Sequence, residues 1–200
     1  VEQSDINSIE LNPVLASGGK FLVLDAVIQL KKYQPKVGFK RLSIRPYPKE
    51  LEKEIILKNG ESAILRPIKP EDEASHRAFD LALDKEDRYK RFFGELPEFS
   101  HDQLAKMTQI DYDREMAFIV TQKLDGKSHT LGVSRVLMDP DNLEAEFAIV
   151  IRSDQKGLGL GRVLLKIAID HCKHQGVGLV SGITLPENTS MIELARQLGF

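Results

Sequence analysis

Three glycines alternate with leucines over residues 157–161, immediately before an apolar run that is typical of a helix. Glycine has no Cβ, so a ligand can approach its backbone closely. The first turn of a helix adds unpaired N–H donors and the positive end of the helix dipole. The pattern therefore predicts an anion site, most often one for phosphate. It fits equally well a tight turn into a packed helix.

The spacing of these glycines excludes two familiar phosphate-binding motifs. A P-loop that began at Gly157 would need its second glycine where Arg162 stands. A dinucleotide fingerprint would need its third glycine where Arg162 or Leu164 stands. Phosphate binding at this loop would therefore belong to another class of protein.

Glu146 is the acidic side chain best placed for proton transfer. It lies within EAEFAIVIRSD, residues 144–154, in an otherwise apolar strand. A carboxylate on a covered strand face loses hydration, which raises its pKa toward the range of a useful general base. The alternative is an edge strand on which Glu144 and Glu146 simply face solvent.

The chemistry requires elements that bring the glycine loop next to Glu146. Asn59-Gly60 predicts a hairpin turn, Pro70 the start of a helix, and apolar residues spaced three and four apart predict a helix after the loop. The expected strands are 55–57, 63–65, 116–122, 131–138, 145–151 and 179–185, and the expected helices are 70–83, 85–93, a short one after Ser100 or Asp102, 160–172 and 190–198. The last part reads as a βαβ unit, in which the helix start lies near strand C-termini, where open α/β sheets bind ligands.

The first 50 residues differ from the rest of the chain in composition and in predicted structure. Residues 6–15 and 21–30 read as two strands around Ser17-Gly18-Gly19-Lys20, a hairpin that needs a partner surface for stability. The segment that follows is basic and proline-containing, which is typical of a linker or an edge segment. We therefore expect three parts: strands at 1–31, a linker at 32–50 and a full domain at 51–200.

Composition narrows the class of protein. A net charge of −2 gives no global attraction to nucleic acid or anionic lipid, and no apolar run reaches the length of a membrane span. A single cysteine, Cys172, excludes an internal disulfide framework and fits a cytoplasmic protein. The chain starts at Val1 without a signal-peptide pattern and stops after an amphipathic stretch, so both ends are expected to be cuts in a longer protein.

Residues 54–200 resemble the GNAT acyltransferase superfamily. Its acyl-CoA signature, [QR]-x-x-G-x-[GA], falls on Lys156–Gly161, with lysine in place of the usual glutamine or arginine. Its C-terminal pattern matches at Asn188, Leu194, Gly199 and Phe200, and departs at Met191 and Ala195. Ala195 stands where many members have a tyrosine that protonates the leaving thiolate.

Two narrower resemblances concern the rest of the chain. Residues 88–120, above all IDYDREMAFIV, look like bacterial protein lysine acetyltransferases of the Pat family. Residues 9–30 resemble the end of an ATP-grasp domain of NDP-forming acyl-CoA synthetases, which large Pat proteins carry ahead of their GNAT domain. Asn12 matches one Mg²⁺ ligand of working ATP-grasp enzymes, but Ser8 stands where the glutamate would be.

The resemblance implies an α/β GNAT fold: a mixed, mostly antiparallel sheet with helices on both faces, plus the N-terminal hairpin. It also implies an acetyl-CoA-dependent protein lysine N-acetyltransferase that transfers the acyl group directly, with Glu146 as general base and no metal. Asp111, Asp113 or Glu115 would replace Glu146 if it is not the base. The implied acetyl-CoA-binding residues are Ala148, Ile149, Val150, Ile151, Lys156, Gly157, Leu158, Gly159, Leu160, Gly161, Arg162 and Asn188.

The implied partner is a protein with a reactive lysine, acetyl-CoA synthetase above all, with neither nucleic acid nor membrane. Three alternatives stay open: a GNAT enzyme for a small amine or a protein N-terminus, a non-catalytic acyl-CoA sensor, and an acyl-CoA ligase whose catalytic parts lie outside this chain. Because GNAT sheets continue after the final helix, the sheet is expected to have an open edge or to borrow a strand such as 21–30, in cis or in a homo-oligomer.

Two other groups of side chains are expected to be structural. Cys172 is expected in the core, since buried thiols behave as small hydrophobes, and Phe92, Phe93 and Phe99 in a core or a lid. The five histidines show no metal-ligand spacing, and His171 and His174 are expected at the surface.

Overall fold

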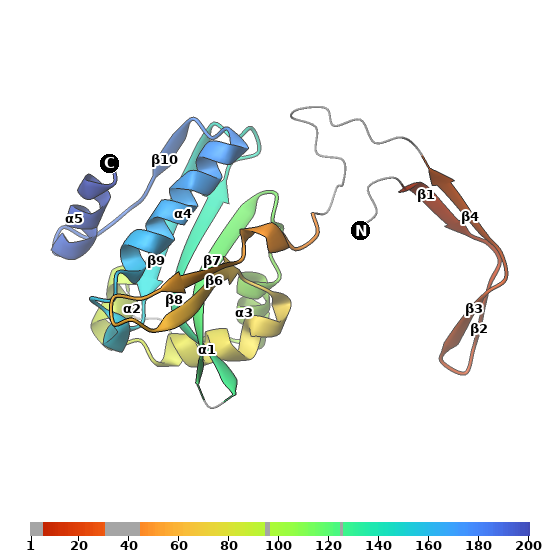
Figure 1. Cartoon of the computed structure of the whole chain (residues 1–200), viewed down its shortest axis with the longest axis horizontal. Helices are drawn as coiled ribbons and strands as arrows, with labels where there is room; N and C mark the ends of the chain where they lie inside the picture. Colours follow the sequence, from red (N-terminus) through yellow and green to blue (C-terminus); the bar gives the residue numbers. More distant parts are fainter. Residues whose placement is uncertain (1–5, 31–44, 95–96, 125) are drawn as a thin grey trace. The chain divides into compact units, whose positions relative to one another are not determined.

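The computed structural model describes residues 6–30, 45–94, 97–124 and 126–200 (Figure 1). The chain divides into two compact units, Val1–Pro46 and Tyr47–Phe200. Most of the expected linker lies outside the described residues. Each unit is described by itself below.

The part of the first unit that the structure describes, residues 6–30, is a two-stranded antiparallel ribbon, as the hairpin signal predicts. Each expected strand is split in two: β1 (Ile6–Leu11) and β2 (Val14–Ser17) run out to the turn, and β3 (Lys20–Val23) and β4 (Ala26–Leu30) run back. β1 pairs with β4 and β2 with β3. Because Pro13 has no N–H to give to the ladder, the first strand is interrupted there.

The second unit contains a six-stranded sheet in the order β10-β9-β8-β7-β6-β5. Its strands are β5 (Lys53–Ile56), β6 (Ser62–Pro67), β7 (Glu115–Leu124), β8 (Lys127–Met138), β9 (Glu144–Ile151) and β10 (Leu179–Ser181). All neighbours are antiparallel except β9 and β10, which are parallel. The expected mixed, mostly antiparallel sheet is confirmed.

Helices cover both faces of this sheet (Figure 1). They are α1 (Glu73–Leu81), α2 (Lys85–Phe92), α3 (His101–Thr108), α4 (Leu160–Gln175) and α5 (Thr189–Gln197), with short 3-10 turns at Lys49–Leu51, Pro70–Asp72 and Ser153–Gln155. Successive residues of a strand point to opposite faces. Phe118 therefore packs in the cluster that contains α4 residues, whereas Ile119 packs with Phe79 of α1.

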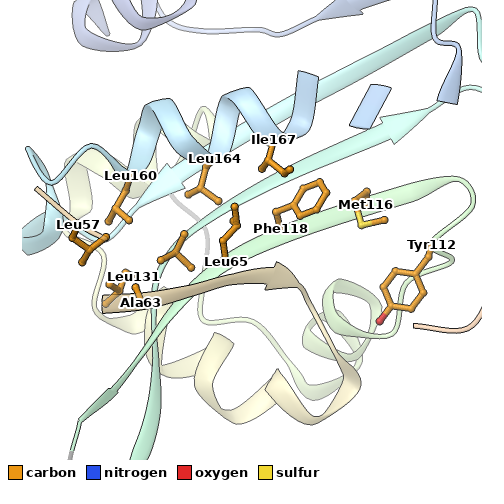
Figure 2. Close-up of a cluster of buried hydrophobic side chains, with 11 residues drawn as sticks. Leu57, Ala63, Leu65, Tyr112, Met116, Phe118, Leu131, Leu160, Leu164 and Ile167 are labelled. Carbon is orange, nitrogen blue, oxygen red and sulfur yellow. The ribbon is translucent and has the colours of Figure 1, made fainter. Parts of the chain in front are cut away.

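The larger core lies between α4 and the sheet. Figure 2 shows Leu164 and Ile167 pointing from α4 toward Leu65 and Phe118. Leu164 and Phe118 are fully buried, so each contributes roughly 1.5–3 kcal/mol to stability through burial. This packing fixes the start of α4, and hence the glycine loop, against the sheet.

Two buried side chains of α4 test the expectations for this helix. Cys172 is buried in the core, as expected, and burial raises the pKa of its thiol to about 11, so it is not a reactive nucleophile. The surface prediction for His171 is wrong: it is buried, with its ring 5.7 Å from that of Phe118. It lies on the apolar face of α4, one residue before Cys172, and follows that face into the core.

β10 is shorter than the expected strand over 179–185. It pairs with β9 only from Leu179 opposite Glu144 to Ser181 opposite Glu146, and beyond Ser181 the backbone diverges from β9. A Cβ on Gly182 would lie 2.5 Å from the Phe147 ring, so the missing side chain lets the backbone pass this ring as it leaves β9. β10 is an outer strand of the sheet, and Leu179 is exposed on it.

No helix within the described ranges is long and apolar enough to cross a membrane.

Candidate active site

The divergence of β10 from β9 leaves backbone groups of β9 without a strand partner. The Arg152 N–H donates to the Leu131 carbonyl and the Asp139 N–H to the Glu144 carbonyl, in one continuous register. Hydrogen-bonded and non-hydrogen-bonded pairs alternate along an antiparallel ladder, so Ala148 and Val150 direct their backbone groups toward β8. Ile149 and Ile151 direct theirs toward the opening. Of the four β9 residues expected to bind acetyl-CoA, Ile149 and Ile151 can therefore offer backbone groups to a ligand, whereas Ala148 and Val150 cannot.

A cleft of about 720 Å³, called here the glycine-loop cleft, runs past this opening. The glycine loop, the first turn of α4, the end of β9 and the start of α5 form its walls. All but one of the residues expected to bind acetyl-CoA line it: Ile149, Val150, Ile151, Lys156, Gly157, Leu158, Gly159, Leu160, Gly161, Arg162 and Asn188. Ala148 lines a neighbouring cavity instead.

The start of α4 has the character of an anion site. Gly159 occupies the N-cap position with a φ of 86°, a left-handed conformation that favours glycine. No side chain caps the helix there, and its first turn holds no acidic residue. The N–H groups at residues 160–162 have no acceptor within the helix, so they and the helix dipole are available to a ligand in the cleft.

Lys156 is placed differently from what the signature suggests. It lines the glycine-loop cleft, but its Nζ lies 2.5 Å from a carboxylate oxygen of Asp87 in α2. Asp87 also accepts a 2.7 Å hydrogen bond from the Ser153 hydroxyl. The positive charge of Lys156 is therefore balanced within the protein and anchors the loop to α2.

Lys58 is a cleft residue that sequence reasoning missed. Its N–H donates to the Leu158 carbonyl at 3.3 Å, which joins the β5–β6 turn to the glycine loop. Its Cε lies 3.4 Å from the position of a Cβ on Gly159. Lys58 directly precedes the Asn59-Gly60 turn, but no local pattern shows that this turn lies against a loop a hundred residues later.

Glu146 lines a second cavity of about 130 Å³, called here the Glu146 cavity. It shares Lys90, Arg91, Ile149, Asn188 and Met191 with the glycine-loop cleft, so the two spaces adjoin. The Glu146 side chain is exposed, so the expected loss of hydration is wrong. It lies on the face of β9 that carries α1 to α3, and these helices leave its carboxylate in contact with solvent.

The three alternative bases are not in the Glu146 cavity. Glu115 forms an ion pair with Arg135. The Asp111 carboxylate accepts the N–H of Asp113 at 3.0 Å within the turn before β7. Neither these two aspartates nor Glu115 lines the Glu146 cavity. Their positions favour structural roles.

Side chains of α5 and of the residues that flank it line one side of the Glu146 cavity. Ala195 lines its wall, so this position offers no phenol to the site. Phe200 lies against Phe147, with ring centroids 5.1 Å apart. Asn188 lines both spaces, and its Oδ1 caps α5 by accepting the Met191 N–H at 3.4 Å.

The arrangement can hold an elongated anionic ligand beside a carboxylate that is open to solvent. The helix start can bind phosphate, the open edge of β9 can pair with amide groups, and Glu146 can accept a proton where the two spaces meet. Within the described part of the chain, no group of three or more His, Cys, Asp or Glu residues is placed to bind a metal ion.

Comparison with known proteins agrees with this geometry. Residues 63–200 match the family model described as acetyltransferase (GNAT) domain. Over 144 residues the chain is 33% identical to the acetyltransferase PA5475 of Pseudomonas aeruginosa, an alignment that covers 72% of this chain and 77% of that protein.

Solved structures share the fold. The GNAT domain of S. lividans PAT superposes with a TM-score of 0.67 at 22% identity, over 77% of this chain and 90% of that one. A spermidine N-acetyltransferase from Vibrio cholerae, solved with CoA and spermine, superposes with a TM-score of 0.56 at 20% identity, over 68% of this chain and 79% of that one. The chain belongs to the GNAT family of acetyltransferases.

Proposed function

We propose that the protein is an acetyl-CoA-dependent protein lysine N-acetyltransferase. The observation that carries this proposal is the meeting of the glycine-loop cleft with the Glu146 cavity at Ile149. The first space suits a long anionic donor, and the second holds a carboxylate next to the place where the donor would end. Acetyl-CoA is the donor that the GNAT fold implies.

Acetyl-CoA would lie with its pyrophosphate at the start of α4 and its pantetheine arm along β9. Backbone N–H groups at residues 160–162 would bind the phosphates, and Lys58 and Arg162 would add positive charge. Ile149 and Ile151 would pair with the amides of the arm. Because the thioester would then end near Ile149, a backbone N–H of β9 can polarise its carbonyl.

The reaction needs a neutral amine, and a free lysine has a pKa of ~10.4. Glu146 would take the proton from the ammonium, directly or through water, and its solvent exposure lets the proton leave afterwards. The amine would attack the thioester carbonyl, so a C–N bond forms, the C–S bond breaks and the nitrogen gives up its second proton to Glu146 or water. Coenzyme A would leave as a thiolate, without help from residue 195, which is alanine.

A protein acceptor is favoured by the exposure of Glu146 and by the similarity in fold to the GNAT domain of S. lividans PAT. The acceptor proposed from the Pat resemblance is acetyl-CoA synthetase, modified at a lysine in the cytoplasm. We further propose that residues 1–31 are the last strands of an ATP-grasp-like domain. Residues 32–50 would form a linker, and residues 51–200 the acetyltransferase domain.

A small-amine acceptor is the second candidate. The Glu146 cavity is only about 130 Å³ and is partly closed by Phe147 and Phe200, which suits a slender amine. The spermidine N-acetyltransferase from Vibrio cholerae shares this fold and was solved with spermine.

A transfer assay with acetyl-CoA separates these functions. The acceptors are a panel of lysine-containing proteins that includes acetyl-CoA synthetase, and a panel of small amines. Transfer to a protein lysine supports the proposal. Transfer to small amines alone supports the second candidate, and acetyl-CoA binding without transfer to either panel supports a sensor.

A further inference from the structure

Lys90 lines the Glu146 cavity and is paired with an acid, as are two arginines that lie nearby without lining it, Arg88 and Arg135. Lys90 pairs with Glu86 and Arg135 with Glu115. Behind them, Arg88 pairs with Asp80 at 2.6 Å. The Lys90 pair lies within α2, the Arg135 pair joins β8 to β7, and the Arg88 pair joins α2 to α1. They leave little net positive charge for a ligand.

Arg91 is different, because it has no hydrogen bond or ion pair to any residue in the described ranges. Its guanidinium carbon lies 4.9 Å from the ring centroid of Phe92, a contact that orients the group without neutralising it. The side chain is half-buried. Its N–H donors have no acceptor within the described ranges, so this position can bind an anion from outside the protein.

Arg91 also stands where the cavities meet. It lines the glycine-loop cleft, the Glu146 cavity and a third cavity of about 40 Å³ beneath α1 and α2. Burial and the positive charge of Arg135 lower the pKa of Arg91, whereas Glu146 acts in the opposite direction. Glu146 is therefore near enough to interact with Arg91, and the two side chains present opposite charges to one cavity.

Phe93 completes this side of the cavity. It follows α2 in a left-handed conformation, with a φ of 59°, which is uncommon for a bulky residue. This turn is held by a 2.7 Å hydrogen bond from the Phe93 N–H to the Tyr89 carbonyl. The exposed ring lines the Glu146 cavity and can pack against the methylene stem of a lysine.

We propose that Arg91 binds a carboxylate of the acceptor, so that the preferred substrate is a lysine with an acidic residue beside it. This inference rests on the proposed function, in which the lysine amine approaches Glu146. The donor does not supply the anion, because its phosphates are assigned to the start of α4 and its acetyl group is uncharged. A guanidinium suits this role because it binds a carboxylate through two parallel hydrogen bonds.

The test uses two peptides of otherwise identical sequence. In one the lysine is flanked by glutamate, and in the other by glutamine. For the wild type we expect about tenfold higher kcat/KM for the glutamate peptide, the size expected of one charge-assisted hydrogen-bonded contact. Arg91→Gln should bring the ratio of the two kcat/KM values down to about one. Arg91→Lys should restore part of the preference. Arg77→Gln, at an exposed position of α1 that lines none of the three cavities, is the matched control and should keep the preference.

A binding measurement makes the result independent of turnover. Calorimetry of each peptide in the presence of coenzyme A should show tighter binding of the glutamate peptide to the wild type but not to Arg91→Gln. Equal binding of the two peptides by the wild type would overturn the proposal, and so would an equal loss for both in the variant. Selective slowing of succinyl-CoA by Arg91→Gln, with acetyl transfer unchanged, would place the anion on the donor and also overturn it.

Failure of the proposed function gives a different result. If neither peptide is acetylated but an ω-amino acid is acetylated about tenfold faster than its amide, protein acetylation is rejected and carboxylate binding by Arg91 is upheld. The same loss of preference in Arg91→Gln must then be seen. If the acid and the amide react equally, both proposals are rejected.

Discussion

The glycine-loop cleft and the Glu146 cavity adjoin but are built on different principles. The cleft relies on backbone: a helix start, a glycine loop and the open edge of β9. Its signature cation, Lys156, is neutralised by Asp87. The Glu146 cavity relies on side chains, with an exposed carboxylate and a half-buried guanidinium that has no acid partner within the described chain. A backbone site suits a constant donor, whereas a side-chain site can be varied to select an acceptor.

The largest effect is expected at Glu146. Glu146→Gln keeps the shape of the side chain but removes its basicity, so kcat should fall by about 10²–10⁴. Raising the pH should partly restore the rate, because more of the acceptor amine is then already neutral. Acetyl-CoA affinity should barely change, since the contacts proposed for it lie in the glycine-loop cleft. Turnover within a few-fold of wild type would remove Glu146 from the mechanism, and equal losses of rate and affinity would indicate misfolding.

Gly161→Asp tests the cleft by adding a negative charge at the second residue of α4. The helix tolerates an acid at its N-terminus, although the new Cβ would lie 3.2 Å from Leu194. Acetyl-CoA affinity should fall roughly ten- to a hundredfold, as expected when hydrogen bonds to a charged group are lost. Gly161→Ala adds the same Cβ without charge and should retain most of the affinity in calorimetry. Unchanged binding by the aspartate variant would reject the phosphate site.

Near the Glu146 cavity, the third cavity contains a histidine that makes the stability of the fold depend on pH. His76 lines the third cavity, and burial together with Arg135 lowers its pKa from its usual 6.5 to about 4. Below pH 6.5 His76 therefore binds a proton in the unfolded chain but stays neutral in the folded protein until the pH falls to about 4. The folded state should lose about 2 kcal/mol between pH 8 and pH 5 from this group. Denaturant unfolding across this range should show a smaller loss of the free energy of unfolding for His76→Leu than for the wild type. His174→Asn, at an exposed position, should lose as much as the wild type.

The smallest effect is expected on acetyl-CoA binding when Lys58 and Lys156, the two lysines beside the glycine loop, are replaced in turn. Exposed cations contribute little each, so Lys58→Gln should weaken acetyl-CoA binding by about two- to fivefold. Lys156→Gln should weaken it less, because Asp87 already balances that charge. Calorimetry at low salt compares them directly. A larger loss for Lys156→Gln would show that the lysine leaves Asp87 when the donor binds.

Local pattern was sufficient for the elements that frame the site. The turn at Asn59-Gly60, the alternating strands and the apolar face of α4 each depend on neighbours within a few residues. The glycine loop was placed correctly at the start of α4 for the same reason. β10 was predicted too long, because its end depends on the Phe147 ring from another strand rather than on its own residues.

The sequence by itself determined the order of the elements, the helix start that can bind phosphate and the strand that carries Glu146. Only the tertiary structure decided which charges are available. Lys156 and Asp87 are 69 residues apart, and their ion pair removes the cation that the signature offers. Lys58 and Arg91 gain their positions from packing against segments far along the chain. The physical reason is that the strength of a charge depends on its solvation and its partners, and both are set by the fold.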